Sequence, residues 1–204
     1  KAVPARSINI EFHRPGKTFV RLGGPPDPFI AQIKLAAGAG VNFVTFPVSL
    51  PWAKPGEAED WEAVDARCQM VLDANPQALL IPRVPMNPPP WWRDAHPDEV
   101  MQWEDGHRAL AVVASPIYRQ EAAARLTAFV EHVEEKFGSH VAGYHPDGQN
   151  TGEWFYEDAW KKPLNGYAPA DLVSWRLWLK QRYLNDEVLR AAWKDPAVKL
   201  DTVT

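Results

Sequence analysis

The residues of this sequence that are best suited to chemistry lie in one stretch, residues 140–160. Glu153 supplies a carboxylate and Asn150 an amide, and Trp154 is the first of several aromatic residues after the acid. A carboxyl group can protonate a leaving group, an amide can hold a hydroxyl, and a flat apolar ring can stack on a sugar. This combination suits a carbohydrate better than a phosphate or a nucleic acid. The alternative is a solvated turn whose aromatic rings only cover the core, because most glutamates are surface charges.

The same stretch has the organisation of a strand followed by a loop. Residues 141–144 form a short apolar run typical of a strand, and Pro146, Gly148 and Gly152 then permit the sharp bends of a loop. Loops at the carboxyl ends of buried strands carry the active sites of parallel β/α folds. The sequence therefore predicts that Glu153 lies on a catalytic loop at the end of a strand.

Earlier parts of the chain repeat this organisation. Residues 41–48 and 78–84 are too apolar to be half exposed, and they predict buried parallel strands. Residues 7–12 alternate enough to form another strand, which would place Glu11 and His13 at or just past its carboxyl end. We treat both side chains as candidates for binding the substrate.

Arg83 lies at the end of the strand predicted at residues 78–84, where it could bind a sugar hydroxyl or pair with an internal acid. A long connection, residues 85–115, follows it. A connection of this length in a compact domain is usually functional or disordered, and its tryptophans argue against disorder. Trp91 and Trp92 in this connection could stack on a sugar ring, or they could pack the loop onto the rest of the fold.

Amphipathic helices are predicted around these strands. Their apolar stripes and end signals fall at residues 28–37, 60–74, 116–137 and 169–183. Ser115 is the predicted N-cap of the third helix, and Asn185 is the predicted N-cap of a last short helix that ends near Trp193. Strands that alternate with helices form either an open wound sheet or a (β/α)8 barrel of the TIM type. Long loops after several separate strands favour the barrel, and the sequence has no glycine-rich phosphate loop to support a nucleotide-binding sheet.

Composition restricts the partners. The net charge of -4 and the pI of about 5.9 argue against nucleic acid. No stretch approaches the roughly 18 apolar residues of a membrane span, and the N-terminus lacks the pattern of a signal peptide. A signal could have been removed, so both a cytoplasmic and a secreted location stay open.

The single cysteine, Cys68, excludes an internal disulfide and predicts a small buried side chain. We expect no metal and no cofactor.

Four groups of residues carry a resemblance to a known family. They are Asn87-Pro-Pro-Pro-Trp91; His96-Pro-Asp-Glu-Val100 with Glu104-Asp-Gly-His-Arg108; Ser115-Pro-Ile-Tyr-Arg119; and Trp178-Leu-Lys-Gln-Arg-Tyr183 with Leu189-Arg-Ala-Ala-Trp193. In order and spacing they resemble the family 42 glycoside hydrolases, bacterial β-galactosidases of the clan of retaining barrel glycosidases. The agreement extends over most of the chain.

The resemblance implies a (β/α)8 barrel that acts on β-linked sugars by a retaining mechanism. That clan normally carries its general acid/base in an Asn-Glu pair after the fourth strand, and the nearest match is Asn150 with Glu153, separated by two residues. Arg108 is similar to a sugar-binding arginine of the family. A retaining glycosidase also needs a second carboxyl group as nucleophile, about 5 to 5.5 Å from the first. The clan takes it from the second half of the barrel, so we expect it outside this chain; Glu11 and Asp147 are the alternatives within it.

The sequence contains only four predicted βα units, whereas a full barrel typically needs about 250 residues. We therefore expect residues 1–204 to form one glycosidase-like barrel domain that is incomplete at its C-terminal end. Half a barrel would expose sheet edges and apolar surface, which favours a homo-oligomer or a complementing second half. Two alternatives stay open: a non-catalytic carbohydrate-binding or assembly domain of barrel origin, and an open-sheet α/β binding protein.

Overall fold

The computed structural model describes residues 27–149 and 154–203. These residues divide into two compact units, which are described separately. Unit 1 contains residues 27–86 and 125–148, and unit 2 contains residues 87–124, 149 and 154–203. The strand predicted at residues 7–12 lies outside the described residues.

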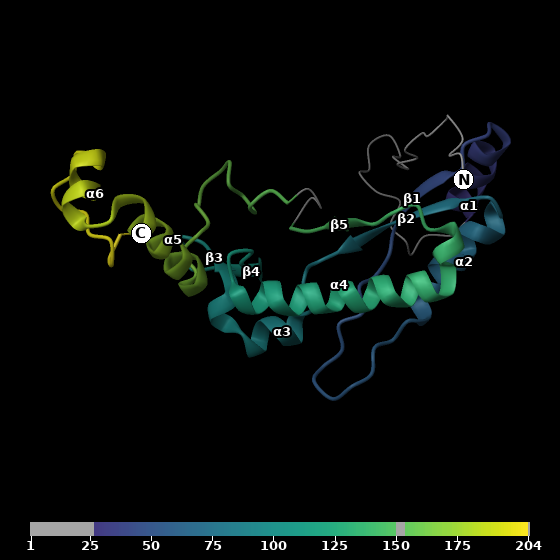
Figure 1. Cartoon of the computed structure of the whole chain (residues 1–204), viewed down its shortest axis with the longest axis horizontal. Helices are drawn as coiled ribbons and strands as arrows, with labels where there is room; N and C mark the ends of the chain where they lie inside the picture. Colours follow the sequence, from purple (N-terminus) through teal and green to yellow (C-terminus); the bar gives the residue numbers. More distant parts are fainter. Residues whose placement is uncertain (1–26, 150–153, 204) are drawn as a thin grey trace. The chain divides into compact units, whose positions relative to one another are not determined.

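Unit 1 contains a parallel three-stranded sheet with β2 in the middle (Figure 1). Its strands are β1 (Phe43–Pro47), β2 (Leu79–Pro85) and β5 (His145–Asp147). β1 and β2 confirm the strands predicted at residues 41–48 and 78–84. Parallel pairing and burial agree with the β-branched and aliphatic content of these runs, because a strand covered on both faces needs few polar positions.

The third strand begins later than predicted. Val141 forms only an isolated parallel bridge with Leu80, and continuous pairing starts at His145. β5 therefore contains Pro146, which cannot donate a ladder hydrogen bond and is tolerated on the edge strand of this sheet. The position at which β5 begins therefore depends more on its pairing with the end of β2 than on the local apolar run.

The helices of unit 1 are α1 (Asp27–Gly38), α2 (Glu62–Ala74) and the C-terminal part of α4 (Pro116–Phe137), followed by the 3-10 turn η2 (Gly138–His140). Each presents a buried apolar stripe, as the 3.6-residue period requires. The buried apolar side chains of unit 1 include Phe29, Ile33, Val44, Phe46, Val64, Cys68, Val71, Leu80, Val84, Phe129 and Val133. The predicted burial of Cys68 is confirmed.

Polar contacts connect α2 to α4. Asp65 of α2 accepts hydrogen bonds from His132, at 2.7 Å, and from Lys136, at 2.5 Å. The ring of Trp61, at the start of α2, stacks on His132 with the ring centroids 4.3 Å apart. These contacts lie beside the buried stripes and fix the two helices against each other.

Unit 2 combines short elements with the first part of α4, residues 116–124, and two later helices. The connection predicted as a loop forms α3 (Pro90–Ala95), the 3-10 turn η1 (Pro97–Glu99) and an antiparallel hairpin of β3 (Val100–Gln102) and β4 (Arg108–Ala111). α5 (Pro169–Tyr183) and α6 (Asp186–Trp193) follow. Two apolar clusters stabilise the unit, one of Met101, Trp103, Val112, Ala168 and Ala170, the other of Leu179, Leu189 and Leu200.

Two predicted helix starts are confirmed by their caps. The Ser115 hydroxyl accepts the backbone amide hydrogen of Tyr118 at 3.0 Å, and the Asn185 side chain accepts that of Val188 at 3.0 Å. Each cap satisfies an amide that has no partner inside its helix. In the described part of the chain, no helix has both the length and the apolar character needed to cross a bilayer.

Candidate active site

The carboxyl ends of the three parallel strands lie side by side in unit 1. Arg83 of β2 is in register with Pro47 of β1 and with His145 of β5, and Pro85 is in register with Asp147. Because side chains alternate between the faces of a sheet, Arg83 and Asp147 point to the same face. The structure thus brings two charged side chains together at the strand ends, where β/α barrels carry their sites.

Arg83 and Asp147 form an ion pair with little contact with solvent. Arg83 Nε lies 3.5 Å from Asp147 Oδ2, and the side chains are 10% and 14% exposed. Burial raises the pKa of Asp147, and the charges of Arg83 and His145 oppose that shift. Of the two roles considered for Arg83, the structure shows the pairing with an internal acid; a role in binding a sugar stays a prediction.

The same face of the sheet carries a buried hydroxyl group, that of Thr45. Thr45 of β1 is in register with Ile81, so its side chain points to the face that carries Arg83. Thr45 Oγ1 is buried and forms no hydrogen bond among the described residues. A buried hydroxyl normally finds a partner, so Thr45 is a polar group that a bound hydroxyl could satisfy. Sequence reasoning missed it, because threonine is common in strands for its shape alone.

In unit 2, Asn87 and Gln149 form a closely matched pair. Asn87 Nδ2 donates to the backbone oxygen of Gln149 at 3.2 Å, and Asn87 Oδ1 accepts the backbone amide hydrogen of Gln149, with 3.1 Å between the heavy atoms. The Gln149 side chain is buried, and its Oε1 has no hydrogen-bond partner within the described ranges. The sequence signal for Asn87 is its place two residues after the end of β2.

The two adjacent tryptophans have different surroundings. Trp92 is fully buried in unit 2, and its Nε1 donates to Glu121 Oε2 at 2.8 Å. Its ring also stacks on His96, with the ring centroids 4.4 Å apart. Trp91 is half-buried. The packing role considered for Trp92 therefore fits its position, and only Trp91 of the two offers surface to a sugar.

Arg108 lies on the exposed edge of the hairpin in unit 2. Its guanidinium donates to Gln102 Oε1 at 2.7 and 3.2 Å and to the backbone oxygen of Pro97 at 3.3 Å. It lines a hollow of about 430 Å³ together with Arg93 and Asp94. A hollow of this size could hold a monosaccharide, but these contacts already hold the guanidinium against the hairpin.

Four predicted site residues lie outside the described residues: Glu153, Asn150, Glu11 and His13. Trp154, the first described residue after residues 150–153, is 46% exposed and has a left-handed backbone conformation with φ of 60°. An exposed indole that directly follows the predicted acid in the sequence is compatible with stacking on a sugar.

A metal centre has no support in the part of the chain that the structure describes. Within residues 27–149 and 154–203, no three His, Cys, Asp or Glu side chains come together in a way that could hold an ion.

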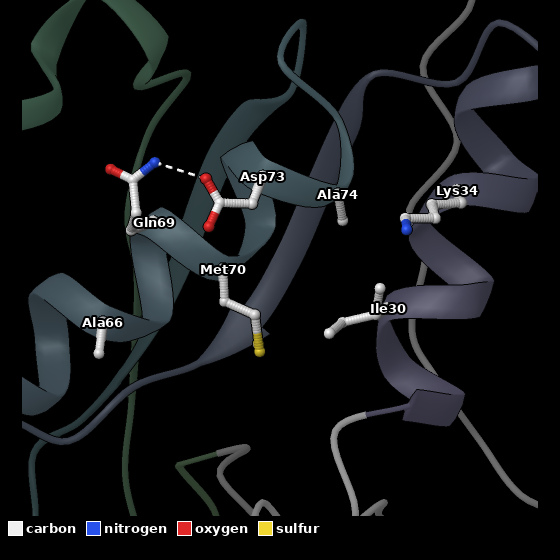
Figure 2. A pocket seen from close by; sticks show the side chains of 7 residues that line it. All are labelled: Ile30, Lys34, Ala66, Gln69, Met70, Asp73 and Ala74. Atoms are coloured by element: carbon white, nitrogen blue, oxygen red, sulfur yellow. Dashed lines mark hydrogen bonds between the residues drawn. The ribbon is translucent and has the colours of Figure 1, made fainter.

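A second hollow, of about 330 Å³, lies between residues of α1 and α2 in unit 1 (Figure 2). Ile30 and Lys34 face it from α1, and Met70 and Asp73 face it from α2. Gln69 Nε2 donates to Asp73 Oδ1 at 2.8 Å, so part of its polar edge is satisfied within α2. No predicted site residue that the structure describes lines this hollow.

Comparison with known proteins identifies a family. Residues 27–196 match the profile of glycoside hydrolase family 42, whose description is β-galactosidase. A comparison with curated protein sequences gave no significant match.

Similar solved structures are glycosidases. A β-galactosidase from the psychrophilic Marinomonas ef1 is 25% identical, with a TM-score of 0.61 over 88% of this chain and 27% of that chain. A β-galactosidase from the Antarctic haloarchaeon Halorubrum lacusprofundi is 22% identical, with a TM-score of 0.58 over 90% of this chain and 28% of that chain. The catalytic domain of a β-amylase from Paenibacillus polymyxa is 17% identical, with a TM-score of 0.70 over 89% of this chain and 50% of that chain.

The last two likenesses show the fold alone. This chain spans about a quarter of the β-galactosidase structures and half of the β-amylase domain. These relatives are TIM-barrel glycosidases, so the predicted fold class, a partial (β/α)8 barrel, is confirmed.

Proposed function

This chain belongs to glycoside hydrolase family 42, and from that premise we propose that it takes part in hydrolysing β-linked galactosides by a retaining double displacement. The match to the family over residues 27–196 is the observation that carries the proposal. A carbohydrate is then the substrate, and no cofactor is needed, because two carboxyl groups suffice for this chemistry.

Glu153 is the proposed general acid/base. In the first step its carboxyl group protonates the glycosidic oxygen while the nucleophile attacks the anomeric carbon, and the aglycone leaves as an alcohol. In the second step the Glu153 carboxylate takes a proton from a water molecule that attacks the anomeric carbon, the bond between the sugar and the nucleophile breaks, and the sugar leaves with its original anomeric configuration. The second carboxylate, the nucleophile, is proposed to lie outside these 204 residues.

The strand ends of unit 1 support this proposal. Arg83 and Asp147 are held together on one face of the parallel sheet, and the hydroxyl of Thr45, which forms no hydrogen bond within residues 27–149 and 154–203, points to that face. A buried hydroxyl costs stability unless it is hydrogen-bonded, and carboxyl groups with a raised pKa, such as Asp147, are frequent at functional sites, so both observations support a ligand site here. Asp147 also stays an alternative for the second carboxylate.

Substrate contacts are proposed for the predicted site residues with polar or flat apolar side chains. They are Asn150, Arg108, Arg83, Trp91, Glu11, His13 and Trp154. Arginine and asparagine would bind sugar hydroxyls, and the indole rings would stack on a sugar face. Trp92 is not among them, because its ring is fully buried.

One side of α5 supports association with further protein. Val173 and Leu177 of α5 are exposed, and their spacing of four residues places them on one side of the helix. Leu184, directly after the helix, is exposed as well. Exposed apolar side chains in line mark packing surfaces. We propose that this side packs either on a second copy or on the part of the protein that supplies the nucleophile. A complete reading frame whose product is much heavier than 23.0 kDa would favour the second occupant.

Replacement of Glu153 tests the proposed function. In the protein expressed from its complete natural reading frame, Glu153→Gln should lower kcat/KM for an alkyl β-galactoside by about 100-fold or more while galactose affinity changes little. Glu157→Gln is the matched control, because Glu157 is a nearby glutamate without a proposed role. Binding without turnover in the unaltered protein would favour a non-catalytic carbohydrate-binding domain.

A further inference from the structure

Two arginines from different elements of unit 2 line the same hollow. Arg93 comes from α3 and Arg108 from β4, and the hollow has a volume of about 430 Å³. This volume lies in the range of pockets that bind small molecules. The hollow, called here the arginine hollow, is completed by Asp94 of α3, Pro97 of η1, Val100 of β3 and Ala109 of β4.

Neutral groups hold the guanidinium of Arg108 in place. Nε and Nη2 donate to Gln102 Oε1 at 3.2 and 2.7 Å, and Nη1 donates to the backbone oxygen of Pro97 at 3.3 Å. A guanidinium has five N–H donors, so one on each terminal nitrogen is left after these three bonds. The bonds thus restrict the side chain without neutralising its charge. The two terminal nitrogens of an arginine can bind both oxygens of a carboxylate.

Arg93 adds a second positive charge to the hollow. Its side chain is half-buried, and within residues 27–149 and 154–203 neither Arg93 nor Arg108 forms an ion pair. Asp94 also lines the hollow, but its exposed carboxylate pairs with neither arginine in the described ranges. Two like charges that line one hollow repel each other, and an anion bound near both offsets that repulsion.

These features favour one class of ligand. We propose that the arginine hollow binds a sugar acid, a monosaccharide whose carboxylate lies near Arg93 and Arg108. Pro97 and Ala109 offer apolar surface to the C–H groups of the ring, and the Asp94 carboxylate can accept hydrogen bonds from ring hydroxyls. The inference needs neither the proposed general acid nor turnover, so it goes beyond the proposed hydrolysis and can fail separately from it.

Calorimetric titration with D-galacturonate tests the inference in the protein expressed from its complete natural reading frame. At low ionic strength we expect a Kd of about 1 mM, as is usual for a ligand of this size. Arg93→Met should weaken binding about 10-fold or more, because one of the two cations is lost. The Arg93 side chain forms no hydrogen bond or ion pair in the described part of the chain, so this variant should fold normally. Arg93→Lys keeps the charge without the planar fork and should lose less affinity.

Two controls separate this site from a general effect of charge. Arg119 of α4 is exposed and does not line the hollow, so Arg119→Met makes the same change in net charge elsewhere in unit 2. It should change the Kd for D-galacturonate less than about 2-fold. D-galactose lacks the carboxylate, so any affinity that the protein has for it should be the same in Arg93→Met and in the unaltered protein.

Three results would overturn the inference. The first is the absence of binding to the unaltered protein at about 10 mM D-galacturonate. The second is an affinity for D-galacturonate that Arg93→Met leaves unchanged, because the ligand would then bind elsewhere. The third is inorganic phosphate that binds through Arg93 as tightly as D-galacturonate, because the hollow would then be a general anion site without selectivity for a sugar.

Discussion

Arg83 and Asp147 form a buried ion pair between adjacent parallel strands, with 3.5 Å between Nε and Oδ2. Burial raises the pKa of Asp147, and Arg83 and His145 act against that rise. The pair connects the end of β2 to β5 on the face to which the Thr45 side chain also points. The same two side chains therefore hold adjacent strands together and form part of the candidate site.

Removing the cation should destabilise the protein in a pH-dependent way. Arg83→Met leaves the Asp147 carboxylate buried without its partner, which should lower the free energy of unfolding by about 3 kcal/mol at neutral pH. The folded-state pKa of Asp147 is already raised, so the loss should shrink as the pH falls through that pKa and the carboxyl group becomes neutral. Urea unfolding at several pH values measures it.

The double variant Arg83→Met with Asp147→Asn is the control for that measurement. It removes both charges, so it should recover much of the lost stability at neutral pH. A double variant as unstable as Arg83→Met alone would show that the ion pair is not the cause.

Asp65 should stabilise the contact between α2 and α4 at neutral pH and lose this effect at acid pH. Burial by itself raises the pKa of Asp65, but hydrogen bonds and charge interactions with Lys136 and His132 outweigh burial, so the net pKa is lowered from 3.8. Because the folded-state pKa is the lower one, the stabilisation is present above the unfolded value and is lost as the pH falls through the folded value. Asp65→Asn should cost about 1 kcal/mol at pH 7 and progressively less at acid pH. A cost that does not change with pH would contradict this.

Trp91 and Trp92 should differ sharply in their effect on stability. Trp92→Ala creates a cavity in unit 2 and leaves Glu121 without its indole donor, so we expect a loss of about 3–5 kcal/mol. Trp91→Ala should cost less than about 1 kcal/mol, because the ring is only half-buried, and should instead raise KM if it stacks on the sugar. Chemical unfolding of the two variants measures the two losses. Equal losses in the free energy of unfolding would contradict this prediction.

Cys68 should be inert in the folded protein. Burial, with a smaller contribution from Asp65, raises the pKa of its thiol to about 12. Since only the thiolate reacts, labelling by iodoacetamide at pH 8 should be slower than for an exposed cysteine by about 1000-fold or more, and fast after denaturation. Rapid labelling of the native protein would show that Cys68 is accessible.

The elements with strong local signals could be predicted from the sequence. The apolar runs of β1 and β2 and the Ser115 cap of α4 gave positions close to those observed. The hairpin of β3 and β4 was missed, because strands of three and four residues are too short to show a period. β5 was placed too early, since pairing with β2 overrides the apolar run that starts at Val141.

Residues of the candidate site could be predicted from the sequence only where a single strand end is enough to place them. Arg83 was recognised because it follows a buried run, but its partner Asp147 depends on strand order, which the sequence pattern does not contain. The contact of Asn87 with Gln149 joins residues 62 positions apart, so no local pattern indicates it. The burial of Trp92 likewise depends on its tertiary neighbour Glu121.

The central claim is that Glu153 is the acid/base of a retaining glycosidase, and chemical rescue tests it most directly. In the full-length protein, Glu153→Ala should hydrolyse 2,4-dinitrophenyl β-galactoside slowly, because its second step lacks the general base. Added azide should accelerate turnover and give β-galactosyl azide, identified from its anomeric proton by NMR. Full activity without azide, or an azide product of α configuration, would contradict the account.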